Sequence, residues 1–512
     1  MKTFYVTTPL YYVNDVPHIG HAYTTVAADV LARWKRLCGE KVFFLTGTDE
    51  HGSKIAEAAA KVQISPLDYA TKYASEFKRL WVVLGISNDD FIRTTEERHR
   101  KIVQFVFSRL EATGDIYPGT YSGWYCTPCE SFYAESDLKD GKCPTCGRAV
   151  EILNEDSYFF RLSRYQDKLL KHYEENPDFL QPNFRSQEII NFVKQGLKDL
   201  SVSRTRVSWG IPVPNHPGHT VYVWFDALIN YITAVGYPMD SSPEAWDSFR
   251  EFWPADVHFV GKEIFRFHAV IWPAMLEALQ INIPKKVFAH GWWTVEGQKM
   301  SKSLGNVVDP HKVCDEYGVD AFRYFLLREV PFGGDGDFSQ GAVLNRYNAE
   351  LANALGNLLS RTLTLIAKHF QGSLPSSAYG KLSLLSDLKP LLSRIQGSYD
   401  RLAYHEALDE TWSLVFRTNK YIDEQAPWKL GPADKEKLSG ILAECSNVLQ
   451  ILAVLLAPVM PEKSAEMWKQ LGRTDSRAAA ARALLKEGVF HPELAQTIQK
   501  GESLFPRKGR WK

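Results

Sequence analysis

The sequence predicts an α/β fold with a doubly wound parallel sheet, a cysteine-rich insertion and a carboxyl-terminal α-helical bundle. Three observations lead to this prediction. Strand and helix patterns alternate in the first hundred residues and again after about residue 220. A stretch rich in Gly, Pro, Cys and aromatic residues separates the two parts, and helical periodicity dominates from about residue 346. Alternating strands and helices favour a parallel sheet that binds its ligands at the carboxyl ends of the strands.

The elements of the first part follow in order. "TFYVTT" is an apolar strand candidate, and helical periodicity begins at Ile19 and ends at Gly39. "KVFFLTGTDEHG" reads as a buried strand that runs into a polar loop, with a helix from about Ser53. The second half of the sheet is expected in "TVYVWFDALINYI", "DVHFVGKEIFRFHAVIWPAML" and "KVFAHGWWTV". In the bundle, Leu351, Leu355, Leu358, Leu359 and Ile366 share one helix face.

Composition limits the possible functions. The chain has 512 residues, 45% of them hydrophobic and 23% charged, which is an ordinary globular balance that allows several domains. The net charge is zero, so a nucleic acid would have to bind a local patch. We see no signal-peptide pattern, and seven cysteines is an odd number, so we expect a reducing cytoplasm. The longest apolar run, Ile451 to Met460, is too short to span a bilayer, so we expect a core helix and no membrane association.

Two short motifs suggest an anion site. In "VPHIGHAYTT", His18 and His21 flank the first turn of the predicted helix, where free N–H groups favour anions, and Gly20 would let a flat ring lie on the backbone. In "QKMSKSLGN", Lys299 and Lys302 would repel each other unless an anion sits between them. Taken singly, the first motif could be two surface histidines and the second a solvated basic loop. Together they could hold a triphosphate and stabilise a departing pyrophosphate.

These motifs carry a family resemblance. "HIGH" in the first half of a split sheet and "KMSKS" after the second half resemble the two signatures of class I aminoacyl-tRNA synthetases. "PLYYVN", "GTDEHG", "VWFDALINY", "GKEIFRFHAVIWPAML" and "DEQAPWK" resemble the methionyl-tRNA synthetases, from Thr3 to beyond Met460. The resemblance implies that Mg²⁺-ATP is the ligand, that Lys302 neutralises pyrophosphate, and that Lys262 lies near the nucleotide. It implies L-methionine and tRNA(Met) as partners.

The resemblance also implies a binding site for the amino acid. Leu10 and Tyr12 fall on the strand that lines the methionine pocket, and Asp49 matches the carboxylate that holds the substrate ammonium group. The positions matching those that enclose the thioether are Trp224, Ala227, Tyr231, Ile264, His268 and Trp272. A thioether is polarisable and favours aromatic contacts, so these residue types suit it. Without the two signatures, plain core packing would be the better explanation of such aromatic residues.

The insertion contains four cysteines in the pattern CxxC-x13-CxxC: Cys126, Cys129, Cys143 and Cys146. Four thiolates at this spacing suit one tetrahedral structural Zn²⁺. A redox CxxC pair and a zinc ribbon that binds nucleic acid by itself are the alternatives. In the resembled family this zinc knuckle is structural.

The bundle contains a candidate RNA site. Asn357 and Arg361 are four residues apart and share a helix face, and Trp428 follows Pro427. An exposed indole beside a guanidinium suits unpaired bases, although a core Trp and a surface Arg is the simpler alternative. The resemblance matches these three residues to the readers of a CAU anticodon. The basic end "FPRKGRWK" either contacts the RNA backbone or is a solvated tail.

The resemblance gives the segments their expected roles. Residues 1–114 and 221–292 are the two halves of a Rossmann-like catalytic domain, 115–220 the connective insertion with its zinc knuckle, 293–345 the KMSKS and stem-contact region, and 346–512 the helical anticodon-binding domain. An Ile, Val or Leu enzyme would need a larger editing insertion, and a Cys enzyme would place zinc in its substrate pocket. A catalytically silent RNA-binding relative would retain the fold alone. We expect a monomer.

Overall fold

The central sheet consists of six parallel strands in the order β3-β2-β1-β11-β12-β7. The computed structural model describes residues 1–129, 131–133, 135–300, 306–375, 377–378, 383–487 and 497–509. The first half comprises β1 (Thr3–Tyr12), α1 (Ile19–Leu37), β2 (Lys41–Asp49), α2 (Ser53–Lys61), α3 (Pro66–Val83), β3 (Asp90–Arg93) and α4 (Glu97–Ala112). The predicted helix starts at Ile19 and Ser53 are confirmed.

The second half of the sheet follows the insertion. It comprises α7 (Val223–Leu228), α8 (Asn230–Thr233), α9 (Pro243–Phe252), β11 (Val257–Gly261), the 3₁₀ turn η4 (Lys262–Ile264), the π-helical turn η5 (Phe267–Ile271), α10 (Trp272–Leu279) and β12 (Val287–His290). The strand order reverses between β1 and β11, which are neighbours in the sheet. In open parallel sheets, ligands bind beyond the carboxyl ends of the strands at such a reversal.

The insertion is built around a four-stranded antiparallel sheet in the order β5-β4-β6-β8. Its elements are β4 (Ile116–Cys126), β5 (Ser131–Tyr133), β6 (Glu151–Phe160), α5 (Gln166–Glu175), β7 (Leu180–Gln181), α6 (Asn183–Lys194), β8 (Leu200–Ser201), β9 (Ser203–Arg204) and β10 (Thr220–Val221). One detail differs from the predicted division at residues 115–220, because β7 pairs with β12 and forms an edge strand of the central sheet. The insertion therefore also completes the sheet domain.

The two faces of the central sheet pack into separate cores because side chains alternate along each strand. Phe4 and Val6 of β1 face one core, and Tyr5 between them faces the other. The first core continues without a break through α1 into the helical bundle, and the second lies under the insertion. The strands are buried on both faces, as parallel strands are.

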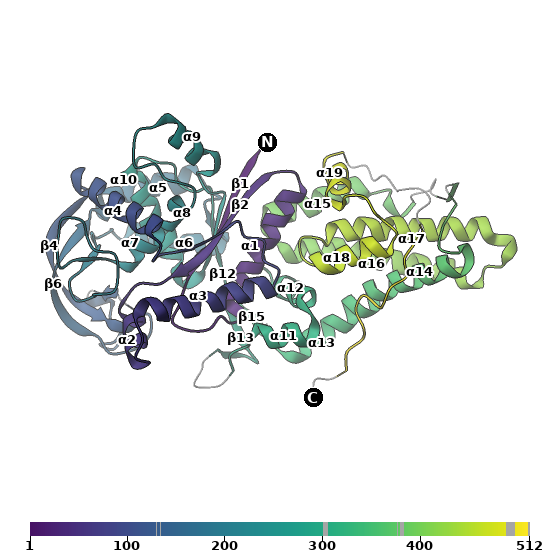
Figure 1. The fold of residues 1–512 in the computed structure, drawn as a ribbon, viewed down its shortest axis with the longest axis horizontal. Coiled ribbons are helices and arrows are strands. Elements are labelled where there is room, and N and C mark those ends of the chain that lie inside the picture. Colours follow the sequence, from purple (N-terminus) through teal and green to yellow (C-terminus); the bar gives the residue numbers. More distant parts are fainter. Residues whose placement is uncertain are drawn as a thin grey trace.

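A helical bundle follows the sheet domain. A connecting region contains β13 (Trp293–Val295), β14 (Gln298–Lys299), α11 (Pro310–Tyr317), α12 (Val319–Arg328), β15 (Gly336–Phe338) and α13 (Gln340–Arg346). The bundle contains the π-helix η7 (Tyr347–Gly356), α14 (Asn357–Phe370), α15 (Leu388–Asp400), α16 (Tyr404–Gln425), the 3₁₀ turn η10 (Pro427–Lys429), α17 (Lys435–Leu455), α18 (Pro461–Gln470) and α19 (Arg477–Glu487). The five leucine and isoleucine positions predicted from periodicity are all buried. Figure 1 shows the bundle extending to one side of the sheet domain, with α1 at their junction.

The buried residue Arg323 connects the segments that meet at the junction between the sheet domain and the bundle. Its guanidinium donates hydrogen bonds to Asp29 of α1 at 2.7 Å and to backbone carbonyls of Leu84, Pro458 and Val459. These partners come from α1, from the end of α3 and from the turn between α17 and α18. A buried arginine is stable only when such partners satisfy its donors, so this contact fixes α1 against the bundle.

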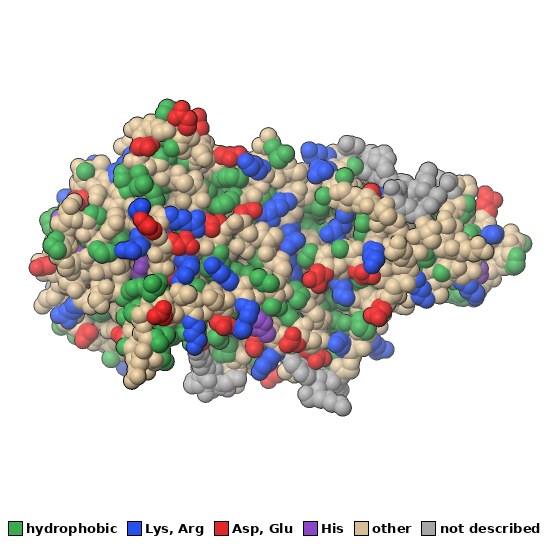
Figure 2. Space-filling model, viewed as in Figure 1, with side chains coloured by type: hydrophobic (Ala, Val, Ile, Leu, Met, Phe, Trp, Pro, Cys, Tyr) green, Lys and Arg blue, Asp and Glu red, His purple; other side chains and the backbone are tan. Residues whose placement is uncertain are grey.

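The longest apolar stretch lies inside the bundle. In the described part of the chain, the helical segment Pro432–Leu455 is long and apolar enough to cross a membrane, but 94% of its apolar window is buried within the protein. Such a helix forms the core of a bundle. On the molecular face of Figure 2, Lys and Arg side chains are interspersed with Asp and Glu, in agreement with the net charge of zero.

Candidate active site

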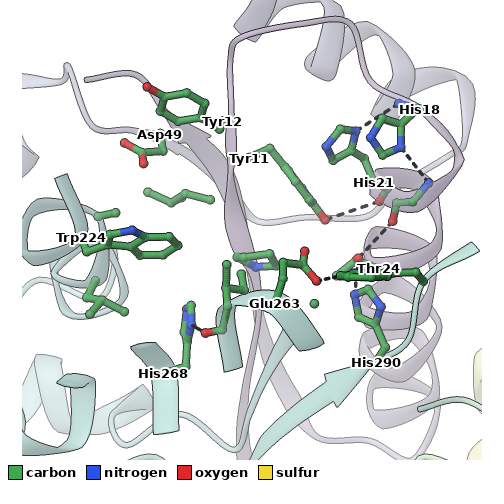
Figure 3. A pocket seen from close by; sticks show the side chains of 18 of the residues that line it. Tyr11, Tyr12, His18, His21, Thr24, Asp49, Trp224, Glu263, His268 and His290 are labelled. Carbon is green, nitrogen blue, oxygen red and sulfur yellow. Dashed lines mark hydrogen bonds between the residues drawn. The ribbon is translucent and has the colours of Figure 1, made fainter. Parts of the chain in front are cut away.

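A cavity of about 660 Å³ opens at the carboxyl ends of β1, β11 and β12. Of the predicted residues, those that line it are Leu10, Tyr12, His18, Gly20, His21, Asp49, Trp224, Ala227, Tyr231, Ile264 and His268. In Figure 3, Tyr12, Asp49 and Trp224 lie at one end of the cavity, and His18, His21 and His290 lie at the other. The structure thus brings together residues from both halves of the sheet.

Hydrogen bonds and burial at the start of α1 determine which ring nitrogen of its two histidines carries the proton and lower the pKa of both. His18 is the N-cap, and its Nδ1 accepts a hydrogen bond from the backbone N–H of Gly20 at 3.1 Å. Nδ1 of His21 accepts one from the backbone N–H of His18 at 3.1 Å. A backbone N–H can only donate, so both neutral rings carry their proton on Nε2. Burial lowers the pKa of His18, and burial together with the neighbouring His18 ring lowers the pKa of His21 well below its ordinary value.

Aromatic side chains that were not predicted surround His21. The rings of Tyr11 and Phe77 each lie 5.1 Å from the His21 ring in edge contacts. The hydroxyl of Tyr11 also lies 2.6 Å from that of Thr25, one turn further along α1. These contacts fix the ring that supplies the Nε2 donor. A Cβ at Gly20 would lie 3.0 Å from the His18 ring, so glycine leaves the ring its space.

The other end of the cavity is aromatic. The Trp224 indole stacks on Phe267 at 3.8 Å with an interplanar angle of 11°. Nδ1 of His268 donates to the carbonyl of Ile264, so its Nε2 accepts the hydroxyl hydrogen of Tyr231 at 2.8 Å. Burial lowers the pKa of His268 to about 4, so this ring is neutral at physiological pH.

Trp272 lies behind this wall, outside the lining of the cavity. It is fully buried and donates its Nε1–H to Nε2 of His258 at 3.2 Å. Its ring centre is 5.9 Å from that of Tyr231. Trp272 therefore supports a lining residue rather than facing the cavity itself. The π-helical turn η5 directly precedes it, and such turns are frequent at functional sites.

Lys262 also lies beside the cavity. Its Nζ lies 2.7 Å from both carboxylate oxygens of Asp335 and covers the ring of Trp292 at 4.1 Å. The next residue, Glu263, does line the cavity and accepts the indole N–H of Trp292 at 2.6 Å. Sequence reasoning missed Glu263, Trp292 and His290. All three stand in or next to the quoted motifs "GKEIF" and "AHGWW", which could have pointed to them.

The motif "QKMSKSLGN" lies only partly within the described residues. The antiparallel pairing of β14 with β13 brings Gln298 and Lys299 next to the site, and Met300 lines the cavity. Lys302 and the side chain of Lys299 lie outside the described residues. Their predicted role therefore stays a prediction.

Three of the four predicted metal ligands converge in the insertion. The Sγ atoms of Cys126, Cys143 and Cys146 lie within 4.8 Å of one another, and those of Cys126 and Cys146 are 3.5 Å apart. Burial alone would raise the pKa of Cys143, but hydrogen bonds from Tyr133 and from the backbone of Cys146 and Thr145 outweigh it and lower this pKa to about 6. The side chain of Cys129 lies outside the described part.

The residues predicted to bind RNA also converge. Arg361 lies over the ring of Trp428 at 5.5 Å and forms a 2.8 Å ion pair with Asp423. The side chain of Trp428 is 51% exposed, so it is not a core residue. Asn357 is exposed one turn before Arg361 on α14. The bundle therefore presents an exposed indole with a guanidinium group in contact with it.

Comparison with known proteins decides the family. Residues 4–151 and 135–363 match the family described as tRNA synthetases class I (M), and residues 376–493 match the anticodon binding domain of methionyl tRNA ligase. The methionine–tRNA ligase of Caldanaerobacter subterraneus is 53% identical over 99% of this chain and 79% of its own length. The chain belongs to the methionyl-tRNA synthetase family.

Other members of the methionyl-tRNA synthetase family agree with this assignment. The methionine–tRNA ligase of Bacillus subtilis is 48% identical over 99% of this chain and 78% of its own length. The structure of Mycobacterium tuberculosis methionyl-tRNA synthetase in complex with methionyl-adenylate superimposes with a TM-score of 0.92, 44% identity, and coverage of 99% of this chain and 100% of that chain. The predicted fold of a class I synthetase is thereby confirmed.

Proposed function

We propose that this protein ligates L-methionine to tRNA(Met) in an ATP-dependent reaction that proceeds through methionyl-adenylate. The observation that carries the proposal is that one cavity joins an aromatic end, which also contains the carboxylate of Asp49, to a helix start bearing two N–H donors. Membership in the methionyl-tRNA synthetase family supports the same substrates.

The reaction needs positioning and charge stabilisation from the protein. The methionine carboxylate attacks the α-phosphorus of Mg²⁺-ATP, a bond to the carboxylate oxygen forms, and pyrophosphate leaves. The Nε2–H groups of His18 and His21, at the positive end of α1, would donate to phosphate oxygens as negative charge shifts to the leaving group. We assign Lys299 and Lys302 to the pyrophosphate. The terminal adenosine of the tRNA then attacks the acyl carbon and releases AMP.

The aromatic end would bind the amino acid. Asp49, which is 8% exposed at the end of β2, would accept the substrate ammonium group. The Trp224 indole and the wall of Tyr231 and His268 would enclose the thioether, with Leu10, Ala227 and Ile264 completing the apolar surface. Trp272 would act from behind Tyr231, and Tyr12 closes the pocket on the side of Asp49.

Binding of methionine should not depend on the protonation of His268 above pH 5.5. Its pKa of about 4 means that the ring remains neutral, whereas a histidine with an ordinary pKa near 6.5 would be mostly charged there, and covering that charge with an apolar side chain would cost desolvation energy. The dissociation constant for methionine without ATP, measured by equilibrium dialysis at pH 7.5, 6.5 and 5.5, should change less than about twofold. A weakening of about tenfold centred near pH 6.5 would show that His268 titrates normally.

The lowered pKa of His268 also makes the stability of the folded protein depend on pH. Because the folded state holds the proton less tightly than the unfolded chain, the neutral ring contributes its full stability above the unfolded pKa near 6.5. That contribution is lost as the pH falls from about 6.5 toward about 4. Dialysis at pH 5.5 therefore lies within this window, and each sample needs a circular-dichroism check that the protein remains folded.

The cysteine cluster fits a structural Zn²⁺. Tetrahedral coordination with Zn–S bonds of about 2.3 Å places sulfurs about 3.8 Å apart, close to the 3.5 Å between Cys126 and Cys146. The lowered pKa of Cys143 favours the thiolate that binds metal. We propose that Cys126, Cys129, Cys143 and Cys146 hold one zinc per chain, and that the zinc stabilises the fold of the hairpin formed by β4 and β6.

Elemental analysis should find about one zinc per chain in protein purified without chelator. Cys146→Ser should lose the metal and destabilise the insertion, because the binding energy of a structural zinc is folding energy. Cys38→Ser, on the sheet domain, is the matched control and should retain the metal. Parent protein without bound metal would refute the assignment.

The bundle would read the anticodon. We propose that Trp428 stacks on an unpaired base and that Asn357 and Arg361 hydrogen-bond to base edges of CAU. Residues 346–512 would then form the anticodon-binding domain, joined to the catalytic halves 1–114 and 221–292 by the region 293–345 and interrupted by the insertion 115–220. A monomer in the cytoplasm remains our expectation for the whole chain.

Transfer to tRNA tests the proposed function. Radiolabelled methionine should become acid-precipitable on tRNA with a CAU anticodon when ATP and Mg²⁺ are present, and not on tRNA in which that anticodon is changed. A protein that binds this tRNA but attaches no methionine to it would be the catalytically silent relative instead.

A further inference from the structure

The ion pair between Lys262 and Asp335 joins two segments that are far apart in the chain. Lys262 begins the turn η4 after β11, and Asp335 directly precedes β15. Both carboxylate oxygens lie 2.7 Å from Nζ, and the Lys262 side chain is only 19% exposed. The ammonium group therefore has its charge compensated within the protein.

This compensation keeps Lys262 out of the cavity. Gly261 and Glu263 on either side of it both line the cavity, and so does Trp292, whose ring the ammonium group covers. Lys262 itself is not among the lining residues. The lysine thus lies at the rim, next to residues that line the space that the proposed function assigns to the nucleotide.

Asp335 is held in place by contacts that do not involve Lys262. Its Oδ1 accepts the backbone N–H of Trp292 at 2.8 Å, and the next residue, Gly336, pairs with Trp293 in the parallel ladder of β13 and β15. Arg185 donates to the carbonyl of Gly333 at 3.2 Å. A Cβ at Gly291 would lie 2.2 Å from the Gly334 carbonyl oxygen, so glycine at that position allows the close approach of this loop.

A fixed carboxylate and a mobile lysine make an exchangeable pair. Lysine is a point charge on a flexible stem, and a polyphosphate offers more negative charge than one carboxylate. Binding of the nucleotide would have to break the pair with Asp335 before Lys262 could contact a phosphate. Each such exchange subtracts the energy of the broken ion pair from the binding energy of ATP.

We infer that Asp335 is a positioning residue that withholds Lys262 from the cavity and releases it to the phosphates of ATP, which lowers the apparent affinity for ATP. The inference rests on the proposed function, because it assumes that the nucleotide enters this cavity. It assigns to Asp335 a role in substrate binding that acts only through Lys262.

The test is a double-mutant cycle measured by methionine-dependent ATP–pyrophosphate exchange. Asp335→Asn removes the charge but retains an oxygen that can accept the Trp292 N–H. The KM for ATP should fall roughly two- to fivefold, the range expected for a partly exposed ion pair. Lys262→Met should raise this KM, and adding Asp335→Asn to Lys262→Met should change nothing further.

A matched control removes another lysine–carboxylate ion pair, which lies at the amino ends of the strands. Glu251 pairs with Lys41 at the amino end of β2, remote from the carboxyl ends of the strands, so Glu251→Gln should leave the KM for ATP unchanged. An unchanged or raised KM in Asp335→Asn would overturn the inference, and so would the same fall in the Lys262→Met background. Parent protein that shows no methionine-dependent exchange would instead refute the proposed function and the inference with it.

Discussion

Replacing His21 by asparagine is expected to slow methionine-dependent pyrophosphate exchange by roughly 10²–10³. The asparagine oxygen can accept the backbone N–H of His18 as Nδ1 does now, so the start of α1 should remain capped. The variant loses the Nε2–H donor, and removal of one preorganised donor to developing charge typically has an effect of this size. The KM for methionine should change little, because His21 lies at the other end of the cavity.

His172→Asn provides the control, since this histidine lies on α5 outside the cavity lining. Its exchange rate should match that of the parent. If His21→Asn retained exchange within a few-fold of the parent while folding normally, His21 would have no part in stabilising the leaving pyrophosphate. A parallel loss of helix content by circular dichroism would point to a structural role in the cap instead.

Loss of Trp428 or Arg361 in the bundle is expected to impair charging of tRNA but not activation of methionine. Trp428→Ala should lower the rate of charging tRNA(CAU) by roughly 5- to 150-fold, the effect of losing one base–aromatic stack. Arg361→Ala should cost at least as much if it leaves a base edge unpaired. Pyrophosphate exchange should remain intact in both, because activation of methionine needs no tRNA and both residues lie in the bundle, away from the cavity.

Arg394→Ala is the matched control for Arg361. It removes an arginine that also pairs with a carboxylate across two bundle helices, at 2.9 Å from Glu410, but has no aromatic ring under it among the described contacts. Charging should be unaffected by this change. Equal losses in charging and exchange for Trp428→Ala would indicate misfolding, and unchanged charging would place the reading of the anticodon elsewhere.

The sequence alone was sufficient for local structure and for residues within motifs. Periodicity predicted the start of α1 at Ile19, and the motif residues His18, Gly20 and His21 meet at one cavity as expected. The half-buried Arg361 and the exposed Trp428 also lie together. Each of these predictions depends on spacing along one helix or on a residue type in a quoted motif.

Contacts between distant segments could not be predicted in the same way. A strand of two residues such as β7 has no period to detect, so its place at the edge of the central sheet depends on the fold of the whole insertion. The pairing of Lys262 with Asp335 joins residues 73 positions apart. Trp272 belongs to the same motif as His268, but it directly follows the π-helical turn that contains His268, and it packs against Tyr231 instead of lining the cavity.

Pyrophosphate exchange into ATP, measured with a panel of single amino acids, shows directly whether this protein activates methionine. We expect strong exchange with L-methionine, weak exchange with norleucine, and much less with leucine or isoleucine. In norleucine a methylene group replaces the thioether sulfur, and an apolar pocket discriminates changes on the scale of one methylene by only about 1–3 kcal/mol, so norleucine should remain detectable. Equal exchange with leucine and methionine, or no exchange with any amino acid, would contradict the proposed activation of methionine.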